Sequence, residues 1–331
     1  MQQPIDKWFA TTSNNESPKP KTIFYFDAKK METKWLHQQL NHIRFSTIIK
    51  WNKKQITLCT NMSQNHDYQI PTETKYNSKH ITFLKSNLQK CIRRGLAEKA
   101  VKTAYHMIKI NLNEFLRRIS IIILEDITLH QAYSTVVWLT AATSSKKNIF
   151  KPNKYIIDWL LGFVNLLCHI EDYDNAGKNN KTYDLIELND NDLLYSLQFR
   201  RSYGGMSCDM KMLDYFTDLW FKRFSNNEKC DETEIELIDS NNIKDLEFEE
   251  WKLEDDNCVG IDFHCAPYII TNLQKKYDYT ETEIKLAIWN CSSKINYRKE
   301  NKPCKEDLEI WNKIKEDYFK EHSNILSRYM K

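Results

Sequence analysis

The sequence predicts a mainly α-helical fold, in which a multi-helix array follows a small N-terminal α+β subdomain and a disordered N-terminal tail. Of the 331 residues, 41% are hydrophobic and 12% are aromatic, which is enough to build a large core. Only six glycines and seven prolines occur, against 28% charged residues. This composition disfavours turn-dense β-sandwiches, and the helical period of apolar residues beyond position 80 favours long helices.

Composition divides the chain into five segments. Residues 11–20 are polar, contain two prolines and have no apolar period, so they predict a flexible tether behind the first nine residues. Residues 228–257 hold 13 acidic residues against three lysines. The predicted segments are a tail with a binding peptide (1–20), an α+β subdomain (21–75), a helical domain (76–227), an acidic linker or insertion (228–257) and a C-terminal helical region (258–331).

The α+β subdomain is predicted from two stretches that are rich in β-branched and aromatic residues, 22–28 and 46–60. Asn52, Lys53 and Lys54 could turn a hairpin within the second stretch. The intervening residues 31–43 predict a helix, because their apolar side chains fall on one helical stripe, formed by Met31, Trp35, Leu36, Leu40 and Ile43.

The helical domain is predicted from apolar residues that recur every three to four positions. Its first helix should end at Gly95, the residue type that most often follows a helix C-terminus. In the C-terminal region, Thr280 and Glu283 have the spacing of a helix N-terminal capping box. The expected helices cover residues 81–95, 96–110, 113–126, 128–143, 155–170, 193–203, 209–224, 267–277, 280–293 and 305–330.

The net charge of +3 conceals an asymmetry. Residues 1–110 carry 19 Lys and Arg against 7 Asp and Glu, a balance of +12, so residues 111–331 carry −9. A basic front third can attract nucleic acid, although solvated lysines explain it equally well. The nine cysteines form no CxxC pair, and no apolar run approaches the roughly 18 residues of a membrane span. Without a signal-peptide pattern, these features predict an intracellular protein with no membrane contact.

The first nine residues carry the pattern Gln-x-x-aliphatic-x-x-aromatic-aromatic, at Gln2, Ile5, Trp8 and Phe9. This pattern resembles the peptide with which client proteins bind a sliding clamp of the PCNA type. Spacings of three and four residues place the three apolar side chains on one side of a helical turn, where they could fill an apolar groove beside Gln2. In the alternative interpretation, Trp8 and Phe9 fold back onto their own subdomain.

Residues 81–144 resemble the helical oligomerisation region of replication-associated recombination ATPases, which are relatives of clamp loaders. The matching positions are Lys90, Arg94, Gly95, Ala100, Ala104, Arg117-Arg118-Ile119 and Glu125-Asp126-Ile127. The resemblance implies self-association or contact with replication partners. It does not imply ATPase activity, because the phosphate-binding GxxxxGK[ST] loop is absent. Alternatively, Arg117 and Arg118 simply pair with Glu125 and Asp126 to join two helices.

Adjacent arginines are the candidates for contact with nucleic acid. The stretch QFRRSYGGM contains the only Gly-Gly of the chain, and Ser207 behind it is a plausible N-cap. Amides at a helix start, two arginines and an aromatic ring could hold a phosphate and a base, or the glycines could simply form a tight turn. The candidate residues are Arg93, Arg94, Arg117, Arg118, Arg200, Arg201 and Tyr203.

Catalytic and metal sites have weaker support. Cys258 and Cys265 lie seven residues apart with no second close pair, which is not the spacing of a zinc finger. A two-metal nuclease would need several carboxylates to converge. The carboxylates that could supply such a site are Glu125, Asp126, Asp172 and Asp174. Two stretches gather other groups that could bind a metal: His169, Glu171, Asp172 and Asp174 in one, and Cys258, Asp262, His264 and Cys265 in the other. No catalytic residue, metal or cofactor is predicted.

These observations predict a non-catalytic accessory protein of DNA replication or repair that a sliding clamp recruits through the N-terminal peptide. DNA is a possible second partner, and the protein could form a homo-oligomer. Its expected location is a site of DNA replication, in a nucleus or a viral replication factory. The alternative is a metal-dependent enzyme that processes nucleic acid and reaches the clamp through the same peptide.

Overall fold

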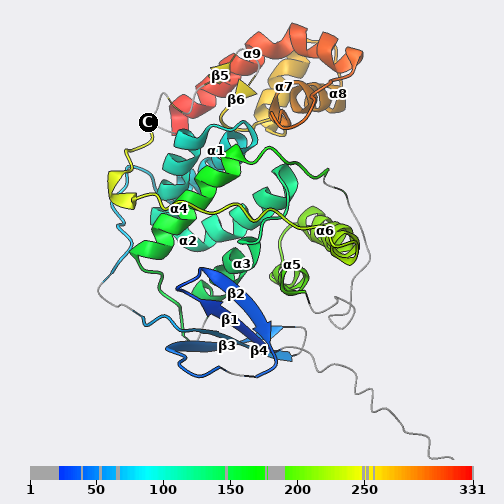
Figure 1. Cartoon of the computed structure of the whole chain (residues 1–331). Helices are drawn as coiled ribbons and strands as arrows, with labels where there is room; N and C mark the ends of the chain where they lie inside the picture. The colour runs from blue at the N-terminus through cyan, green and yellow to red at the C-terminus, as the bar shows by residue number, and fades with distance from the viewer. Residues whose placement is uncertain are drawn as a thin grey trace, which may run out of the picture.

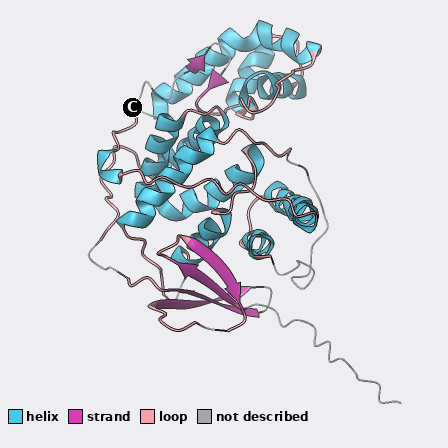
Figure 2. Ribbon diagram, in the orientation of Figure 1, coloured by secondary structure: helices cyan, strands magenta, loops and turns pink. Residues whose placement is uncertain are grey.

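The computed structural model describes residues 22–38, 40–51, 54–64, 68–145, 148–175, 177, 191–247, 250, 253–255 and 258–329. It confirms the predicted fold class, since this part of the chain contains nine α-helices and a small four-stranded sheet near its N-terminal end. The sheet lies at one end of the helical array, and the last three helices lie at the opposite end (Figures 1 and 2).

The sheet has the strand order β2-β1-β4-β3. Strands β3 (Phe45–Trp51) and β4 (Lys54–Thr60) pair antiparallel, with Trp51 opposite Lys54, which confirms the predicted hairpin; Asn52 and Lys53 themselves lie outside the described residues. Strand β1 (Ile23–Asp27) pairs parallel to β4, so β1 and β4 form the centre of the sheet.

The helix predicted at residues 31–43 is wrong. Glu32–Leu36 form strand β2, which pairs antiparallel with β1. Trp35 is buried and stacks on Phe24, with 4.2 Å between the ring centroids, and its indole Nε1 donates a hydrogen bond to Ser196 Oγ at 3.0 Å. These contacts with distant parts of the chain outweigh the local helical spacing of the apolar residues.

The predicted helices of the central array are all present. They are α1 (Ile81–Arg93), α2 (Ala97–Asp126), α3 (Tyr133–Thr143), α4 (Lys154–His169), α5 (Asp192–Ser202) and α6 (Ser207–Ser225). Gly95 follows α1 with the positive φ of +68° that its predicted role requires. Helix α2 breaks at Asn111, where the backbone is non-helical and the side-chain Oδ1 accepts a hydrogen bond from Glu114 N–H, so the two helices predicted there are joined end to end.

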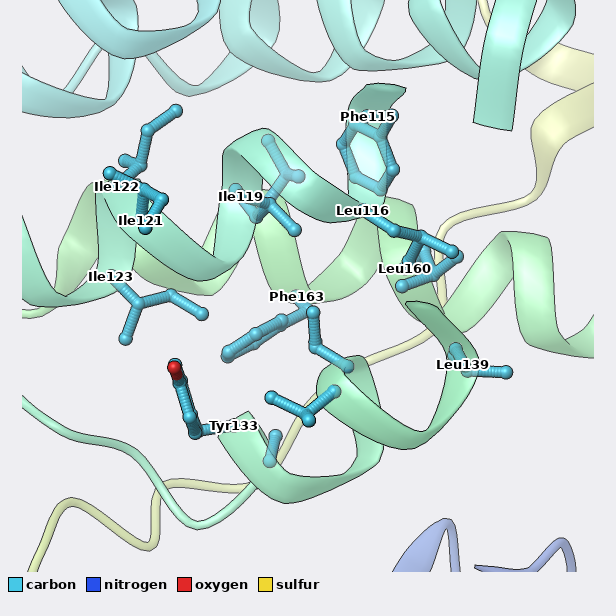
Figure 3. Close-up of a cluster of buried hydrophobic side chains, with 14 of the residues drawn as sticks. Phe115, Leu116, Ile119, Ile121, Ile122, Ile123, Tyr133, Leu139, Leu160 and Phe163 are labelled. Carbon is cyan, nitrogen blue, oxygen red and sulfur yellow. The ribbon is translucent and has the colours of Figure 1, made fainter. Parts of the chain in front are cut away.

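The main hydrophobic core joins the sheet to helices α1–α6 in one cluster. Figure 3 shows its centre, where side chains of α2 pack against those of α3 and α4. Every residue of α3 is buried, and the second half of α2 contributes a run of inward-facing isoleucines. Residues 81–144, the segment that resembles the oligomerisation region of the recombination ATPases, therefore contribute much of the interior of this fold.

Residues 228–247, here called the acidic strap, run in extended form across α4 (yellow in Figure 1). Ser240 N–H donates to the Asp158 carboxylate, and Leu246 is fully buried. The carbonyl oxygen of Glu236 comes so close to Gly162 that a β-carbon there would lie 1.9 Å from it. This part of the predicted acidic linker therefore packs against the helical body.

Residues 258–329 form a C-terminal module with its own hydrophobic cluster. Its helices are α7 (Pro267–Lys276), α8 (Glu281–Ile288) and α9 (Lys305–Tyr329), and a π-helical turn, η5 (Trp289–Ser293), follows α8. The predicted capping box is present, because Thr280 and Glu283 exchange hydrogen bonds at the start of α8. Strand β6 (Cys258–Val259) begins the module and pairs with β5 (Leu253–Asp255), which lies just before it in the chain.

The module docks on the helical body through apolar side chains, since Ile261 and Leu326 belong to the main core, and through polar groups. Asn296 Nδ2 donates to the carbonyl of Asp126 at the end of α2, at 3.0 Å. The Arg298 guanidinium donates to carbonyls at the ends of α1 and α4, which include Ile92 O at 2.8 Å and Ile170 O at 2.6 Å. Two side chains of one loop thus satisfy carbonyls at the C-terminal ends of three helices.

Candidate functional site

A basic cavity of about 560 Å³ lies between α1, α2 and the turn from α5 to α6. We call it the basic cavity; its cationic residues are Lys85, Lys90, Arg117, Arg118 and Arg200, and its acidic residues are Glu114, Asp209 and Asp262. Five positive charges against three negative ones leave a net charge of +2. A concave surface with this charge attracts anions.

Helices α1 and α2 present matching polar residues one helical turn apart. Lys85 forms an ion pair with Glu114, and four residues further along each helix Arg118 Nη2 donates to Gln89 Oε1. Gln89 in turn donates through Nε2 to Asp126 Oδ2 at 2.7 Å. These contacts between α1 and α2 hold α2 in the orientation in which Arg117 and Arg118 line the cavity.

Lys90 closes one end of the cavity. It is buried, and its ammonium lies 3.3 Å from the Asp262 carboxylate of the C-terminal module. Burial lowers the pKa of Lys90 to about 8, and the charge of Asp262 opposes this decrease. Asp262 also accepts hydrogen bonds from Ser293 Oγ and from the backbone of His264, so this ion pair joins the module to the body.

Arg200 forms the opposite wall, at the end of α5. Its side chain is buried, and its hydrogen-bond partners among the described residues are neutral oxygens: Ser120 Oγ at 2.7 Å, Arg117 O at 3.1 Å and Gly204 O at 3.2 Å. Burial lowers the pKa of Arg200, and the nearby Arg117 charge acts in the same direction. Gly204 has φ +75°, so the Gly-Gly stretch forms the predicted tight turn. Ser207 is not the N-cap, because Met206 occupies that position of α6.

The other predicted nucleic-acid residues lie elsewhere. Arg93 is 4% exposed and forms a 2.6 Å ion pair with Asp126, and Arg94 is 2% exposed with its Nη2 directed at Ser292 O. Their burial contradicts direct contact of either guanidinium with nucleic acid. Arg201 pairs with Asp214 at 2.5 Å, and Tyr203 packs on Phe199. Of the seven candidates, the cavity brings together Arg117, Arg118 and Arg200.

The alternative pairing of Arg117 and Arg118 with Glu125 and Asp126 does not form an ion pair among the described residues, although the charge of Arg118 opposes the increase in the pKa of Glu125. Arg93 of α1 forms ion pairs with both carboxylates, at 3.6 Å from Glu125 and 2.6 Å from Asp126. Burial raises the pKa of Glu125, and the neighbouring charge of Asp126 adds to the effect. Arg93 is thus the residue that ties α1 to the end of α2.

The residues suggested for a metal site do not converge. Asp126 pairs with Arg93, and Asp174 pairs with Arg223 at 2.7 Å and accepts from Thr128 at 2.9 Å. Among the described residues, no three His, Cys, Asp or Glu side chains are grouped so that they could hold a metal ion. Asp262 and His264 bond to each other, Cys265 is exposed, and the side chain of Cys258 lies outside the description.

A larger cavity, of about 920 Å³, lies between the acidic strap, the start of α3 and the β1–β2 turn. Its lining holds Lys29 and Lys30 against Glu32, Asp192, Glu232, Glu234 and Glu236, and His130. Two positive charges against five negative ones give a balance of −3 with histidine neutral. This cavity would therefore repel phosphates, which the basic cavity attracts.

The predicted clamp-binding residues Gln2, Ile5, Trp8 and Phe9 lie outside the described residues. In the part of the chain that is described, no helix has both the length and the apolar character to cross a bilayer. Comparisons with models of protein families, with curated proteins and with solved structures find no match to the chain.

Lys85, Gln89 and Asp262 were not predicted as parts of this site. A signal for the first two was present, because Lys85 and Gln89 have the same four-residue spacing as Glu114 and Arg118. Asp262 offered no such signal, since it meets Lys90 across 172 residues of sequence.

Proposed function

We propose that the protein is a non-catalytic accessory factor of DNA replication or repair that a sliding clamp recruits through Gln2, Ile5, Trp8 and Phe9. The observation that carries this proposal is the spacing of these four residues at the start of the chain, ahead of a polar segment with two prolines. Such peptides bind by inserting apolar side chains of one helical turn into a groove.

The arrangement of charges in the body supports a binding role. Asp126 and Asp174, which a metal-dependent nuclease would need as ligands, each form an ion pair with an arginine. The basic cavity instead collects cationic groups around a concave surface. Such a surface suits the binding of phosphates rather than their hydrolysis.

Tethering gives the mechanism. A peptide followed by about ten polar residues would hold the helical body close to DNA that the clamp encircles. For a short flexible linker, the effective concentration of the body at the DNA is on the order of millimolar. Weak contacts between the body and DNA are then sufficient.

The test is calorimetric titration of a peptide covering residues 1–21 into the sliding clamp of the source organism. We expect saturable binding by the unaltered peptide and none by a peptide with Trp8→Ala and Phe9→Ala. A Gln3→Ala peptide is the matched control, since Gln3 lies outside the pattern, and it should bind like the unaltered one. Absence of binding by the unaltered peptide, or equal binding by the double variant, would refute the proposal.

A further inference from the structure

Three guanidinium groups at the basic cavity form no ion pair with a carboxylate in the described part of the chain. Arg200 bonds to neutral oxygens, Arg118 bonds to the Gln89 amide, and the Arg117 guanidinium makes no hydrogen bond or ion pair with the described residues. Lys85 and Lys90, by contrast, are each paired with an acidic residue of the same lining. Three arginines and one carboxylate, Asp209, remain, and they account for the net charge of +2.

Keeping these charges partly out of water is costly unless an anion compensates them. Arg200 is 2% exposed, and the Nε atom of Arg118 is buried without a hydrogen-bond partner among the described residues. Nearby, the buried charge of Arg93 is compensated by Asp126. The unfilled Nε donor of Arg118, together with the positive charge that three arginines bring to one cavity, points to a ligand that carries negative charge.

The dimensions and walls of the cavity restrict this ligand. A volume of about 560 Å³ falls within the roughly 300–1,000 Å³ of small-molecule sites. The described lining contains no aromatic side chain on which a base could stack, and its apolar part is limited to Ile121 and Met206. Recognition would therefore depend on charge and not on the base.

We propose that the basic cavity binds a terminal phosphate, the monoester group found at the 5′ end of a DNA strand or on a free nucleotide. Guanidinium forks match phosphate oxygens in pairs, and Arg117, Arg118 and Arg200 approach from two helices. A monoester carries about −1.5 to −2 at neutral pH, against −1 for a phosphodiester, and so matches the net +2 of the lining. The choice of DNA as the source rests on the function proposed above.

The test compares two single-stranded oligonucleotides, identical in sequence and labelled at the 3′ end, one with a 5′-phosphate and one with a 5′-hydroxyl. Fluorescence anisotropy with the full chain at constant salt should show at least about tenfold tighter binding of the phosphorylated strand. Arg117→Gln and Arg118→Gln should each remove most of this preference, and they should weaken binding of the hydroxyl strand less than binding of the phosphorylated strand. Since Arg117 makes no observed contact, its variant should fold like the unaltered protein.

The control variants are Lys50→Gln and Lys320→Gln, which remove the same charge from exposed positions outside the cavity. They should keep the preference for the 5′-phosphate. Competition with dATP identifies the source: displacement of the strand by dATP at equal affinity assigns the site to free nucleotides, and weak displacement assigns it to strand ends. Equal binding of both oligonucleotides by the unaltered protein, or a preference that survives Arg117→Gln and Arg118→Gln, overturns the proposal. The assay contains no clamp, so its result is independent of the peptide titration.

Discussion

Replacement of Arg298 tests whether polar caps hold the C-terminal module on the helical body. The guanidinium of Arg298 donates to Leu167 O and Ile170 O at the end of α4, and to Ile92 O and Arg93 O at the end of α1. These carbonyls lie at helix C-terminal ends, where intrahelical partners run out; Ile92 O also accepts from Gly95 N–H at 3.2 Å, and Arg93 O accepts from Tyr297 N–H at 3.1 Å. Arg298→Met keeps much of the aliphatic length and removes every donor of the guanidinium.

The magnitude follows from the number of carbonyls that lose their donor. A hydrogen bond to a charged group contributes roughly 1.5–3 kcal/mol, and a neutral one about 1 kcal/mol. Three bonds of 2.8 Å or less would give roughly 4.5–9 kcal/mol, but Arg298 is only half-buried, water can replace part of the loss, and Ile92 O keeps a second donor in Gly95 N–H. We therefore expect Arg298→Met to lower the free energy of unfolding by about 2–4 kcal/mol, a large share of the roughly 5–15 kcal/mol of a typical domain.

Urea unfolding followed by tryptophan fluorescence measures this change, and hydrogen exchange locates it. Amides of residues 258–329 should exchange faster in Arg298→Met than in the unaltered protein, while those of α3 should change little, because α3 lies in the other hydrophobic core. Lys302→Gln is the control, since Lys302 is exposed and pairs only with Glu300 in the same loop. A loss below about 0.5 kcal/mol in Arg298→Met, or one equal to that of Lys302→Gln, would refute the capping role.

Two further predictions concern the acidic strap and the buried histidines. Gly162→Ala should destabilise the protein by about 2–3 kcal/mol, because its β-carbon would collide with Glu236 O, and proteases should then cleave the acidic strap more readily. Helix propensity alone predicts the opposite, a gain in stability of about 1 kcal/mol, and that result would contradict the packing of the strap on α4. Burial lowers the pKa of both His106 and His322 to about 4, below the 6.5 of a histidine in the unfolded chain. Between these two values the unfolded state binds more protons than the folded state. The free energy of unfolding should therefore fall as the pH drops from 6.5 towards 4. The free energy of unfolding, measured with urea, should be about 2 kcal/mol lower at pH 5 than at pH 7 for each histidine, and the difference should be smaller in His106→Gln. Equal pH dependence in His106→Gln and the unaltered protein would contradict a buried, neutral His106.

The helices were predictable because their information is local. Apolar residues at helical spacing, Gly95 behind α1 and the Thr280 capping box each act within a few residues of the feature that they specify. The β3–β4 hairpin belongs to the same class, since its two strands are adjacent in the chain. The helix prediction for residues 31–43 was wrong because the contacts that decide their structure are not local. Trp35 stacks on Phe24 and bonds to Ser196, which is 161 residues away.

Among the candidate site residues, the sequence identified arginine pairs but could not divide them by role. Arg93 and Arg201 each form an ion pair with a carboxylate, whereas Arg117, Arg118 and Arg200 line a cavity without forming one among the described residues. The sequence by itself therefore determined the helices of the central array and the C-terminal module, and which segments carry charge. Tertiary structure alone decided which charges are neutralised, because an ion pair depends on a few ångströms between residues that the chain separates by tens or hundreds of positions.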